Sequence, residues 1–410
     1  MTGLIHRRKT TNSILVFFTI AMSGIPLFTG SEFLSVFYFL SLILVSLKRK
    51  LVLSRKQTLV IILFLVIEVI QHILHGPYSW RTSIGTLIKL SSAYLTVQLI
   101  SVDFSKIYIR QMVVFSVISF IFYLLQFNSG IRVFIVENIA SFFESQGGLN
   151  NSFYERSPSI ILYTFDPIAI EQGRNSGPFW EPGAFATFLL IALLFSILQS
   201  KHKSMKTNWI LVLALISTFS TTGFICLFIL YGGIKLLQRG LLSKLSIPII
   251  VIAGIFFFNN TDFLRKKIVH NIAVADQTTS SRFGSALADL ALFSDSPLVG
   301  WGRGPKRYGP LTVTHLEKEN HRNNGLFILL ASYGFLGSVI YFVNVYRGLM
   351  SLNITRKNKW KFLCFLILLS LSFSQDILFK PLFLCIVFFS IVNKAKVQGA
   401  HEARYSYTLL

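Results

Sequence analysis

Long apolar runs, interrupted by short polar segments, dominate this chain. We expect a membrane-spanning helix in most of these runs, because about 20 apolar residues at ~1.5 Å per residue cross a hydrocarbon core of ~30 Å. Several runs are short, so the prediction is an all-α transmembrane bundle of about twelve (10–12) spans. The expected spans are residues 12–30, 33–47, 57–74, 84–100, 111–127, 179–199, 208–220, 222–238, 245–258, 323–346, 361–375 and 377–393. The least defined stretch is 208–238, where STFSTTG at 217–223 predicts a tight bend or a broken helix.

A loop rich in glycine and proline precedes one of these runs. Residues 171–190 read EQGRNSGPFWEPGAFATFLL and place Arg174 and Glu181 before an uncharged stretch that reaches Gln199. Proline is favoured at the first position of a helix, where its missing N–H has no partner to lose. We therefore expect a helix from Pro182 to about Gln199, with the charged loop at the membrane surface on the side away from the lysines that follow.

Composition supports a membrane protein. Of the 410 residues, 53% are hydrophobic and 14% are charged, and the mean hydropathy is +0.61. Soluble chains carry about 25% charged residues. The expectation is a single integral membrane domain over residues 1–410. A basic cluster at 6–9 precedes the first run and no small-residue cleavage site follows it, so we expect that run to stay as an anchor.

The net charge of +22 follows the predicted topology. With both termini in the cytoplasm, the inside segments contain 24 of the 39 basic residues but only two acidic ones, Asp103 and Glu402. This asymmetry is typical of cytoplasmic loops in membrane proteins, so nucleic acid is not an expected partner. The three cysteines lie in apolar runs, where Cys behaves as a small hydrophobic residue, and no disulfide framework is indicated.

Two predicted outer segments are long, 128–178 and 259–322, and loops of such length are often functional. In the second, apolar residues recur at the spacing of one helix face, with Ser280 and Ser281 as possible N-caps. The residues of that face are Phe283, Ala286, Leu287, Leu290 and Ala291. We expect a short amphipathic helix along the outer membrane face, with Arg282 at its start.

Polar groups in these outer segments are the candidates for chemistry. Arginine binds phosphate oxygens through two parallel hydrogen bonds and stays charged at any working pH. Several arginines that converge at an outer leaflet would suit a lipid-linked diphosphate. The alternative for each is a headgroup contact or a loop salt bridge. The candidate arginines are Arg174, Arg282, Arg303, Arg307 and Arg322.

Glu181 and His321 are the candidate catalytic residues. Glu181 precedes a predicted helix whose positive end favours the ionised carboxylate; it could orient Arg174, accept a proton or cap the helix. His321 opens HRNNGLFILL at the start of the span 323–346. Imidazole is the commonest general base near neutral pH, and the alternative is a histidine that reaches to the membrane interface.

Other polar patterns do not predict a metal or a cofactor. The segment HLEKENH at 315–321 alternates as in a strand and matches no metal motif, and the glycines of GWGRGP at 300–305 lack the strand and the Lys-Ser/Thr of a nucleotide loop. Glu68, His72 and Lys89 lie inside predicted spans, where charged groups are costly and often functional. A Glu68–Lys89 pair, a packing role and a transport role are the alternatives.

Four segments, in order, resemble those of a known family. They are GRNSGPFWEPGAFATFLL (173–190), STTGFICLFIL (220–230), SRFGSALADLALFSDSPLVGWGRG (281–304) and HRNNGLFILLASYGFLG (321–337). Over roughly residues 170–340, their order and spacing resemble the O-antigen polymerase and O-antigen ligase superfamily of bacterial integral membrane glycosyltransferases. The last segment departs from the family pattern, because Arg322 stands where the family often has Asn directly after the histidine.

The resemblance implies roles for the candidate residues. His321 would be the base near the acceptor hydroxyl, and Glu181 would orient the first arginine. A departing diphosphate needs its developing charge neutralised, which arginines can do electrostatically without a metal. The implied ligands of the undecaprenyl diphosphate are Arg174, Arg282, Arg303 and Arg322.

The function expected on this basis is a polymerase that joins undecaprenyl-diphosphate-linked oligosaccharide repeat units at the periplasmic face of the bacterial inner membrane. One alternative is the ligase that transfers finished chains to a lipid A-core acceptor. Another is a transporter or flippase, which would predict polar residues spread through many spans and symmetry between halves. The expected partners are the lipid-linked donor and acceptor, membrane lipids, and a chain-length regulator and a flippase of the same pathway.

Overall fold

In the computed structural model, most of the chain is helical. The structure describes residues 2–29, 31–76, 80–144, 157–199, 205–238, 281–303, 322, 324–352 and 358–391, with isolated positions between 240 and 256. The first half contains α1 (Thr2–Gly24), α2 (Pro26–Thr29), α3 (Glu32–Lys48), α4 (Arg55–His75), α5 (Trp80–Ile100), η1 (Ser101–Asp103), α6 (Phe104–Leu125), α7 (Ser129–Ile135), the π-helix η2 (Val136–Ala140), α8 (Ser141–Glu144) and α9 (Pro167–Glu171). The second half contains α10 (Pro182–Gln199), α11 (Met205–Ser217), α12 (Thr221–Leu237), α15 (Arg282–Asp295), α17 (Gly325–Ser351), α18 (Asn358–Ser374), α19 (Pro381–Phe388) and η3 (Phe389–Ile391). A short antiparallel pair, β1 (Ser159–Ile160) and β2 (Tyr163–Thr164), precedes α9.

The helices are those of an all-α membrane protein, but the count of twelve spans is not confirmed. Among the described residues, three helical stretches are long and apolar enough to cross a bilayer: Arg55–His75, Trp80–Leu125 and Gly325–Ser351. The second of these joins α5, η1 and α6 into 46 residues, with a positive φ of 55° at Ser101. The apolar helices α10, α11 and α12 are shorter. The predicted span 245–258 is described only at isolated positions.

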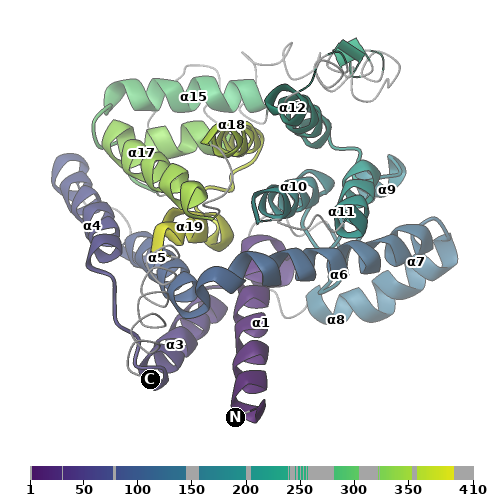
Figure 1. Ribbon diagram of the computed structural model, residues 1–410, viewed down its shortest axis with the longest axis horizontal. Coiled ribbons are helices and arrows are strands. Elements are labelled where there is room, and N and C mark those ends of the chain that lie inside the picture. The colour runs from purple at the N-terminus through teal and green to yellow at the C-terminus, as the bar shows by residue number, and fades with distance from the viewer. Residues whose placement is uncertain are drawn as a thin grey trace.

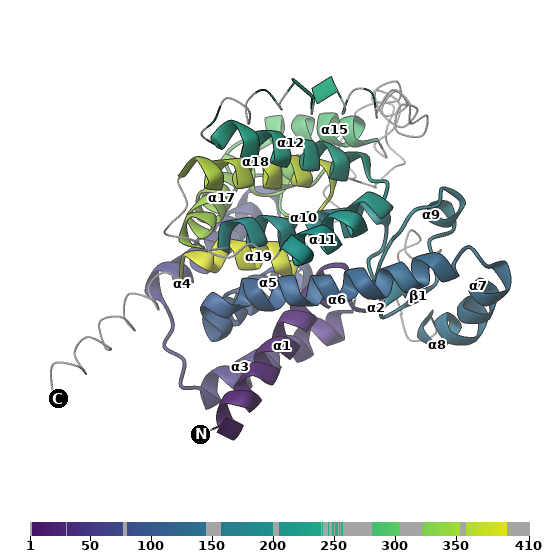
Figure 2. The same ribbon diagram turned by 45° about the vertical axis from the view of Figure 1, so that its right-hand side comes forward.

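Helix α10 lies in the middle of the bundle. It begins at Pro182 and ends at Gln199, as the proline and the following polar segment predicted. From Ala184 to Leu194 every side chain is buried, which is expected of a helix that is apolar on all sides. In Figures 1 and 2 it lies between α12 and α18 on one side and α6 on the other, with α11 alongside. The loop before α10 is therefore fixed to a rigid, central element.

A second buried helix, α19, also begins with proline. All eight residues from Pro381 to Phe388 are buried, and the helix packs against α5 and α17. It starts later than the predicted span 377–393, because residues 375–380 form a turn between α18 and α19. The preceding residue, Lys380, has an extended conformation with ψ of 143°.

The predicted bend at 217–223 is confirmed. Helix α11 ends at Ser217 and α12 begins at Thr221. Between them Phe219 takes a positive φ of 44°. The Ser220 hydroxyl then accepts a hydrogen bond from the Gly223 amide at 3.2 Å, as an N-cap does. The bend turns the chain back beside α10 and exposes backbone carbonyl groups to the loop that contains Arg174.

The glycine-rich segment after α15 packs into a break in α17. The break is at Gly334, whose φ of 61° and ψ of −165° are not helical. Residues 297–302 lie against it: the amides of Trp301 and Gly302 donate to the carbonyls of Ala331 and Ser332, at 2.9 and 2.8 Å. In return, the amides of 335 and 336 donate to the carbonyls of 297 and 298, at 2.7 and 3.0 Å. The segment thus satisfies backbone groups that the broken helix leaves unpaired.

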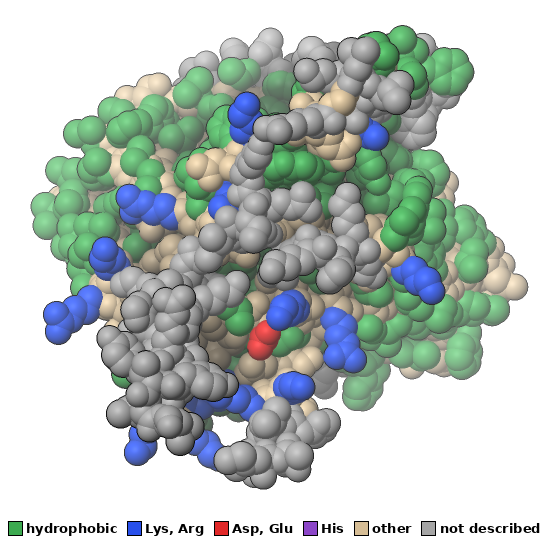
Figure 3. Space-filling model, viewed as in Figure 1, with side chains coloured by type: hydrophobic (Ala, Val, Ile, Leu, Met, Phe, Trp, Pro, Cys, Tyr) green, Lys and Arg blue, Asp and Glu red, His purple; other side chains and the backbone are tan. Residues whose placement is uncertain are grey.

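Basic side chains follow the helix ends that the sequence places in the cytoplasm. Figure 3 shows many Lys and Arg side chains and almost no acidic ones on one face of the described chain. They occur where α3 and α12 end, at Lys48 and Lys235, and where α6 and α11 begin, at Lys106 and Lys206. The loop before α10 and the turn before α12 lie at the opposite ends of these helices.

Gly334→Ala is expected to destabilise the protein by about 1–3 kcal/mol or more, since this backbone conformation is nearly exclusive to glycine. A Cβ atom there would also stand 2.4 Å from the Leu298 carbonyl carbon. The matched control is Gly85→Ala in α5, where a Cβ meets nothing within 4 Å, so alanine should be neutral or stabilising by ~0.5–1 kcal/mol. Thermal unfolding of the detergent-purified variants is the measurement. Equal midpoints for both variants would contradict this role of Gly334.

Candidate active site

Several helix ends meet beside the start of α10. Arg282, the first residue of α15, donates from Nε to the Ser374 carbonyl at the end of α18, at 3.0 Å. The Asn324 side chain, which caps α17, donates to the Arg282 carbonyl at 3.4 Å. The next residue of the α18–α19 turn, Gln375, donates from Nε2 to Glu181 Oε1 at 2.5 Å. Four segments that are distant in sequence therefore form one polar junction.

Arg174 is buried in this junction, with 7% of its surface exposed. Its Nε donates to the Thr218 carbonyl in the α11–α12 bend at 3.1 Å, and its Nη1 donates to Gln172 Oε1 at 3.3 Å. Burial lowers its pKa below the usual value for arginine, while the carboxylates of Glu181 and Asp166 oppose that shift. The guanidinium therefore stays charged in a largely dry environment.

Asn175 fixes the loop that contains Arg174, and sequence analysis missed it. The side chain is fully buried and donates to the hydroxyls of Ser119 and Ser217, at 3.2 and 3.0 Å. Its Oδ1 accepts from the Gly177 amide at 2.9 Å. Gly177 has a φ of 54°, and a Cβ there would lie 2.7 Å from the Phe185 ring. The loop thus has one defined path between α6, α11 and α10.

The Glu181 carboxylate also acts electrostatically on Arg282. Ser281 caps α15, as the sequence predicted, by accepting a hydrogen bond from the Gly284 amide at 2.9 Å. Burial lowers the pKa of Arg282, and the Glu181 carboxylate opposes this shift. Arg282 in turn acts on Arg174, since it contributes to lowering the pKa of that residue. The structure therefore brings Arg174, Glu181 and Arg282 together, although 108 positions separate the two arginines.

Helix α15 turns its polar side toward the protein. Its buried residues are Gly284, Ser285, Ala286, Ala288, Asp289 and Leu292. Three residues of the predicted apolar face, Phe283, Leu287 and Leu290, are 43–52% exposed. This arrangement is the reverse of a soluble amphipathic helix and agrees with a helix whose outer side faces lipid.

Asp289 pairs with Arg322, one of the predicted site residues. It has no exposed surface, and its Oδ1 lies 3.4 Å from Arg322 Nε. Burial raises the pKa of Asp289 to about 7; Arg322 opposes this shift and the Asp376 carboxylate adds to it. Sequence analysis missed Asp289, although its spacing of seven residues from Arg282 places both on one side of a helix. His321 lies outside the described residues.

Arg303 belongs to a different group of cations. Its guanidinium lies 4.2 Å from the centre of the Phe379 ring. It acts electrostatically on Lys89 and on Lys380, and Lys380 Nζ lies 5.2 Å from the centre of the Trp180 ring. Sequence analysis placed residues 377–380 inside the predicted span 377–393 and missed the role of residues 375–380 as the connection between both groups.

The intramembrane polar residues have several partners. Glu68 accepts a hydrogen bond from the Tyr333 hydroxyl at 2.8 Å. His72 stacks on Trp80 with 4.5 Å between ring centres. The charges that act on Lys89 are Arg303, Lys380, Asp376 and Glu32. Lys89 therefore lies near the charged groups at this end of the bundle.

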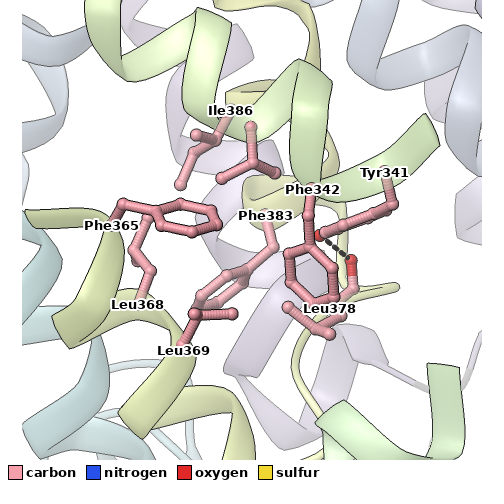
Figure 4. Close-up of a pocket in the computed structure, with 9 residues that line it drawn as sticks. Tyr341, Phe342, Phe365, Leu368, Leu369, Leu378, Phe383 and Ile386 are labelled. Atoms are coloured by element: carbon pink, nitrogen blue, oxygen red, sulfur yellow. Dashed lines mark hydrogen bonds between the residues drawn. The ribbon is translucent and has the colours of Figure 1, made fainter. Parts of the chain in front are cut away.

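An apolar crevice lies between α17, α18 and α19 (Figure 4). Its lining consists of Tyr341, Phe342, Val345, Phe365, Leu368, Leu369, Leu378, Phe383 and Ile386. The one hydroxyl among them, on Tyr341, donates to the Leu378 carbonyl at 2.7 Å. A crevice without charged groups does not suit a phosphate or a sugar.

No group of three or more metal-ligating side chains occurs among the described residues. The alternating histidines and glutamates at 315–321 lie outside them.

Asp289→Asn is expected to flatten the pH dependence of stability. Because the pKa of Asp289 rises from 3.8 to about 7 on folding, this group favours the folded state at low pH, and its contribution is lost as pH rises through 7. Thermal unfolding between pH 5 and pH 8 measures the slope. Asp295→Asn, at the exposed end of the same helix, is the control and should keep the wild-type slope. An unchanged slope in Asp289→Asn would show that Asp289 does not titrate there.

The comparison with known proteins agrees with this geometry. No curated protein matches the chain. The family model described as WcaD colanic acid polymerase matches residues 9–395, which include the loop before α10, the α11–α12 bend, α15 and the α18–α19 turn. The chain therefore belongs to the WcaD colanic acid polymerase family.

Proposed function

We propose that this protein joins polyprenyl-diphosphate-linked oligosaccharide repeat units at the periplasmic face of the bacterial inner membrane. The observation that carries the proposal is the meeting of Arg174 and Arg282 around Glu181, at one end of the bundle. Membership of a polysaccharide polymerase family supports the polymerase over the ligase, which shares the same motifs.

The two arginines suit the diphosphate of a lipid-linked donor. Each guanidinium is fixed by a hydrogen bond from Nε to a backbone carbonyl, at 3.1 Å for Arg174 and 3.0 Å for Arg282. Guanidinium groups bind phosphate oxygens bidentately. The helices α10, α12, α15 and α17 all begin here, and the positive ends of their dipoles favour an anion.

The proposed reaction is a transfer of glycan from diphosphate to a hydroxyl group. The bond between the anomeric carbon and the diphosphate oxygen breaks, and a bond from that carbon to the acceptor oxygen forms. The electron pair of the broken bond stays on the diphosphate, whose added charge Arg174 and Arg282 stabilise. The hydroxyl proton goes to His321, which we assign as base from its place in the sequence, four residues before the first residue of α17. Because the arginines supply the positive charge, no step requires a metal.

Glu181 acts as a positioning residue in this proposal. It acts electrostatically on both arginines, and Gln375 fixes its carboxylate. Without this negative charge the two cations would repel each other in a buried site. Arg322, held by Asp289, lies in the segment that leads to α17 and would keep that segment close to the acceptor hydroxyl.

The periplasmic placement follows from charge distribution. The candidate site lies at the helix ends opposite to those that carry Lys48, Lys106, Lys206 and Lys235. Cytoplasmic loops carry the excess of basic residues in membrane proteins. The transporter alternative is disfavoured, since the polar groups concentrate at one end of the bundle.

Arg174→Lys and Arg282→Lys are expected to lower the rate of chain growth by on the order of 10²–10³-fold, as loss of one fixed oxyanion donor does. Lysine keeps the charge but not the planar fork. Polymer length on gels, in cells that express each variant at the wild-type level, is the measurement. Arg110→Lys, an exposed arginine at the other helix ends, should retain full-length polymer. Wild-type polymer from either site variant would remove that arginine from the site.

Deletion of the gene separates the polymerase from the ligase. A polymerase deletion should leave single repeat units attached to their acceptor, because attachment continues while elongation stops. A ligase deletion should instead leave long polymer on the polyprenyl lipid. Gel analysis of the surface glycan and of the extracted lipid-linked glycan distinguishes the two. Unattached long polymer would reject the polymerase proposal.

A further inference from the structure

Three further cations lie beside the candidate site. Lys89 comes from α5, Arg303 from the segment after α15, and Lys380 from the turn before α19. In the part of the chain that the structure describes, no carboxylate lies within ion-pair distance of any of them. By contrast, Glu181 acts on Arg174 and Arg282.

The three cations are close enough to act on one another. Arg303 and Lys380 both act on Lys89, and Arg303 acts on Lys380. Asp376 offsets part of this repulsion for both lysines, and Glu32 does so for Lys89. All three side chains are only partly exposed. Repulsion among partly buried like charges is unfavourable, so the cluster suits a bound anion with more than one negative charge.

Aromatic rings hold two of these cations in place. Arg303 lies over Phe379 at 4.2 Å, and Lys380 lies 5.2 Å from the Trp180 ring. A cation over a ring face is stabilised without a formal negative charge. The ring contacts therefore fix the cations and leave their positive charge available to a ligand.

The two groups of cations are joined through consecutive residues. Trp180 contacts Lys380, while its neighbour Glu181 acts on Arg174 and Arg282. The turn after α18 makes the second connection, since Gln375 binds Glu181 and Lys380 belongs to the other group. Two basic groups thus lie on either side of one short segment.

We propose that Lys89, Arg303 and Lys380 bind the diphosphate of a second lipid-linked substrate beside the Arg174–Arg282 pair. The proposal rests on the proposed function: a polymerase joins two lipid-linked saccharides, and each carries its own diphosphate. A transfer to an acceptor without diphosphate would need only the first pair. Arg303, which sequence analysis grouped with the first pair, is reassigned to this second subsite.

The test counts bound diphosphates. The full-length protein in phosphatidylcholine nanodiscs is titrated with undecaprenyl diphosphate, and bound lipid is counted by native mass spectrometry. We expect two equivalents for the wild type and one for Lys89→Gln and Lys380→Gln, whose second dissociation constant should rise about tenfold or more. Arg174→Gln should lose the other equivalent. Lys106→Gln, an exposed lysine at the opposite helix ends, is the control and should bind two.

The outcomes separate this proposal from the proposed function. One equivalent in the wild type, lost only in Arg174→Gln, overturns the second subsite and leaves the polymerase proposal intact. Two equivalents that Arg174→Gln does not reduce would instead contradict the first site. Lys380→Arg keeps the charge and should restore the second equivalent, which shows that the glutamine variant has not simply misfolded; failure of this rescue in a folded variant counts against the subsite.

A phospholipid headgroup shares the phosphate chemistry, so the titration is repeated in nanodiscs with phosphatidylglycerol. Retention of the second equivalent supports a diphosphate subsite. Its displacement by phosphatidylglycerol, with no loss of the first equivalent, would show a headgroup site and overturn the proposal.

Discussion

The carboxylate of Glu181 is the charge on which the proposed site depends. Burial of a guanidinium costs several kcal/mol unless hydrogen bonds and an opposite charge compensate. Arg174 is buried and Arg282 is partly buried, and Glu181 acts on both. Its own position is set by Gln375, so the turn between α18 and α19 controls where the two cations meet. The segments around α10 are arranged to meet this need for compensation. Arg174 and Arg282 come from different parts of the chain, and each donates a hydrogen bond to a backbone carbonyl of a further segment, at Thr218 and Ser374.

The bundle places its polar groups inside at one end and its apolar groups outside. Helix α15 is the clearest example, with Asp289 fully buried and Leu287 52% exposed. In water this arrangement would be unfavourable, but against lipid it buries the polar groups and leaves apolar side chains in an apolar solvent. The same arrangement explains why composition alone indicated a membrane protein. The positions of the charged groups relative to one another could be found only from the structure.

Sequence rules located the features that depend on local backbone chemistry. Pro182 begins α10 because proline tolerates the first helical position, Ser281 caps α15 because a hydroxyl accepts from a free amide, and the polar segment at 217–223 breaks the helix. Each of these depends on a few neighbouring residues, so the sequence contains the necessary information.

Contacts between distant segments were not predictable in this way. Lys380 lies over Trp180, 200 positions away in the sequence, and no local pattern connects the two. The docking of 297–302 into the break at Gly334 likewise depends on both partners. The sequence argued against a nucleotide-binding loop at these glycines. It could not predict that they pack against the break in α17. The span count is not confirmed, because hydropathy does not distinguish a short buried helix such as α19 from a complete membrane crossing.

The prolines that open α10 and α19 have a consequence for geometry. A residue before proline is restricted to extended conformations, and Lys380 adopts one, with ψ of 143°. Glu181 and Lys380, which precede Pro182 and Pro381, therefore cannot be wound into the following helix as an extra turn. The proline ring thus fixes where each helix begins, and with it the distance of the Glu181 carboxylate and the Lys380 ammonium group from the first helical turn. Two opposite charges are in this way held at the ends of two central, tightly packed helices.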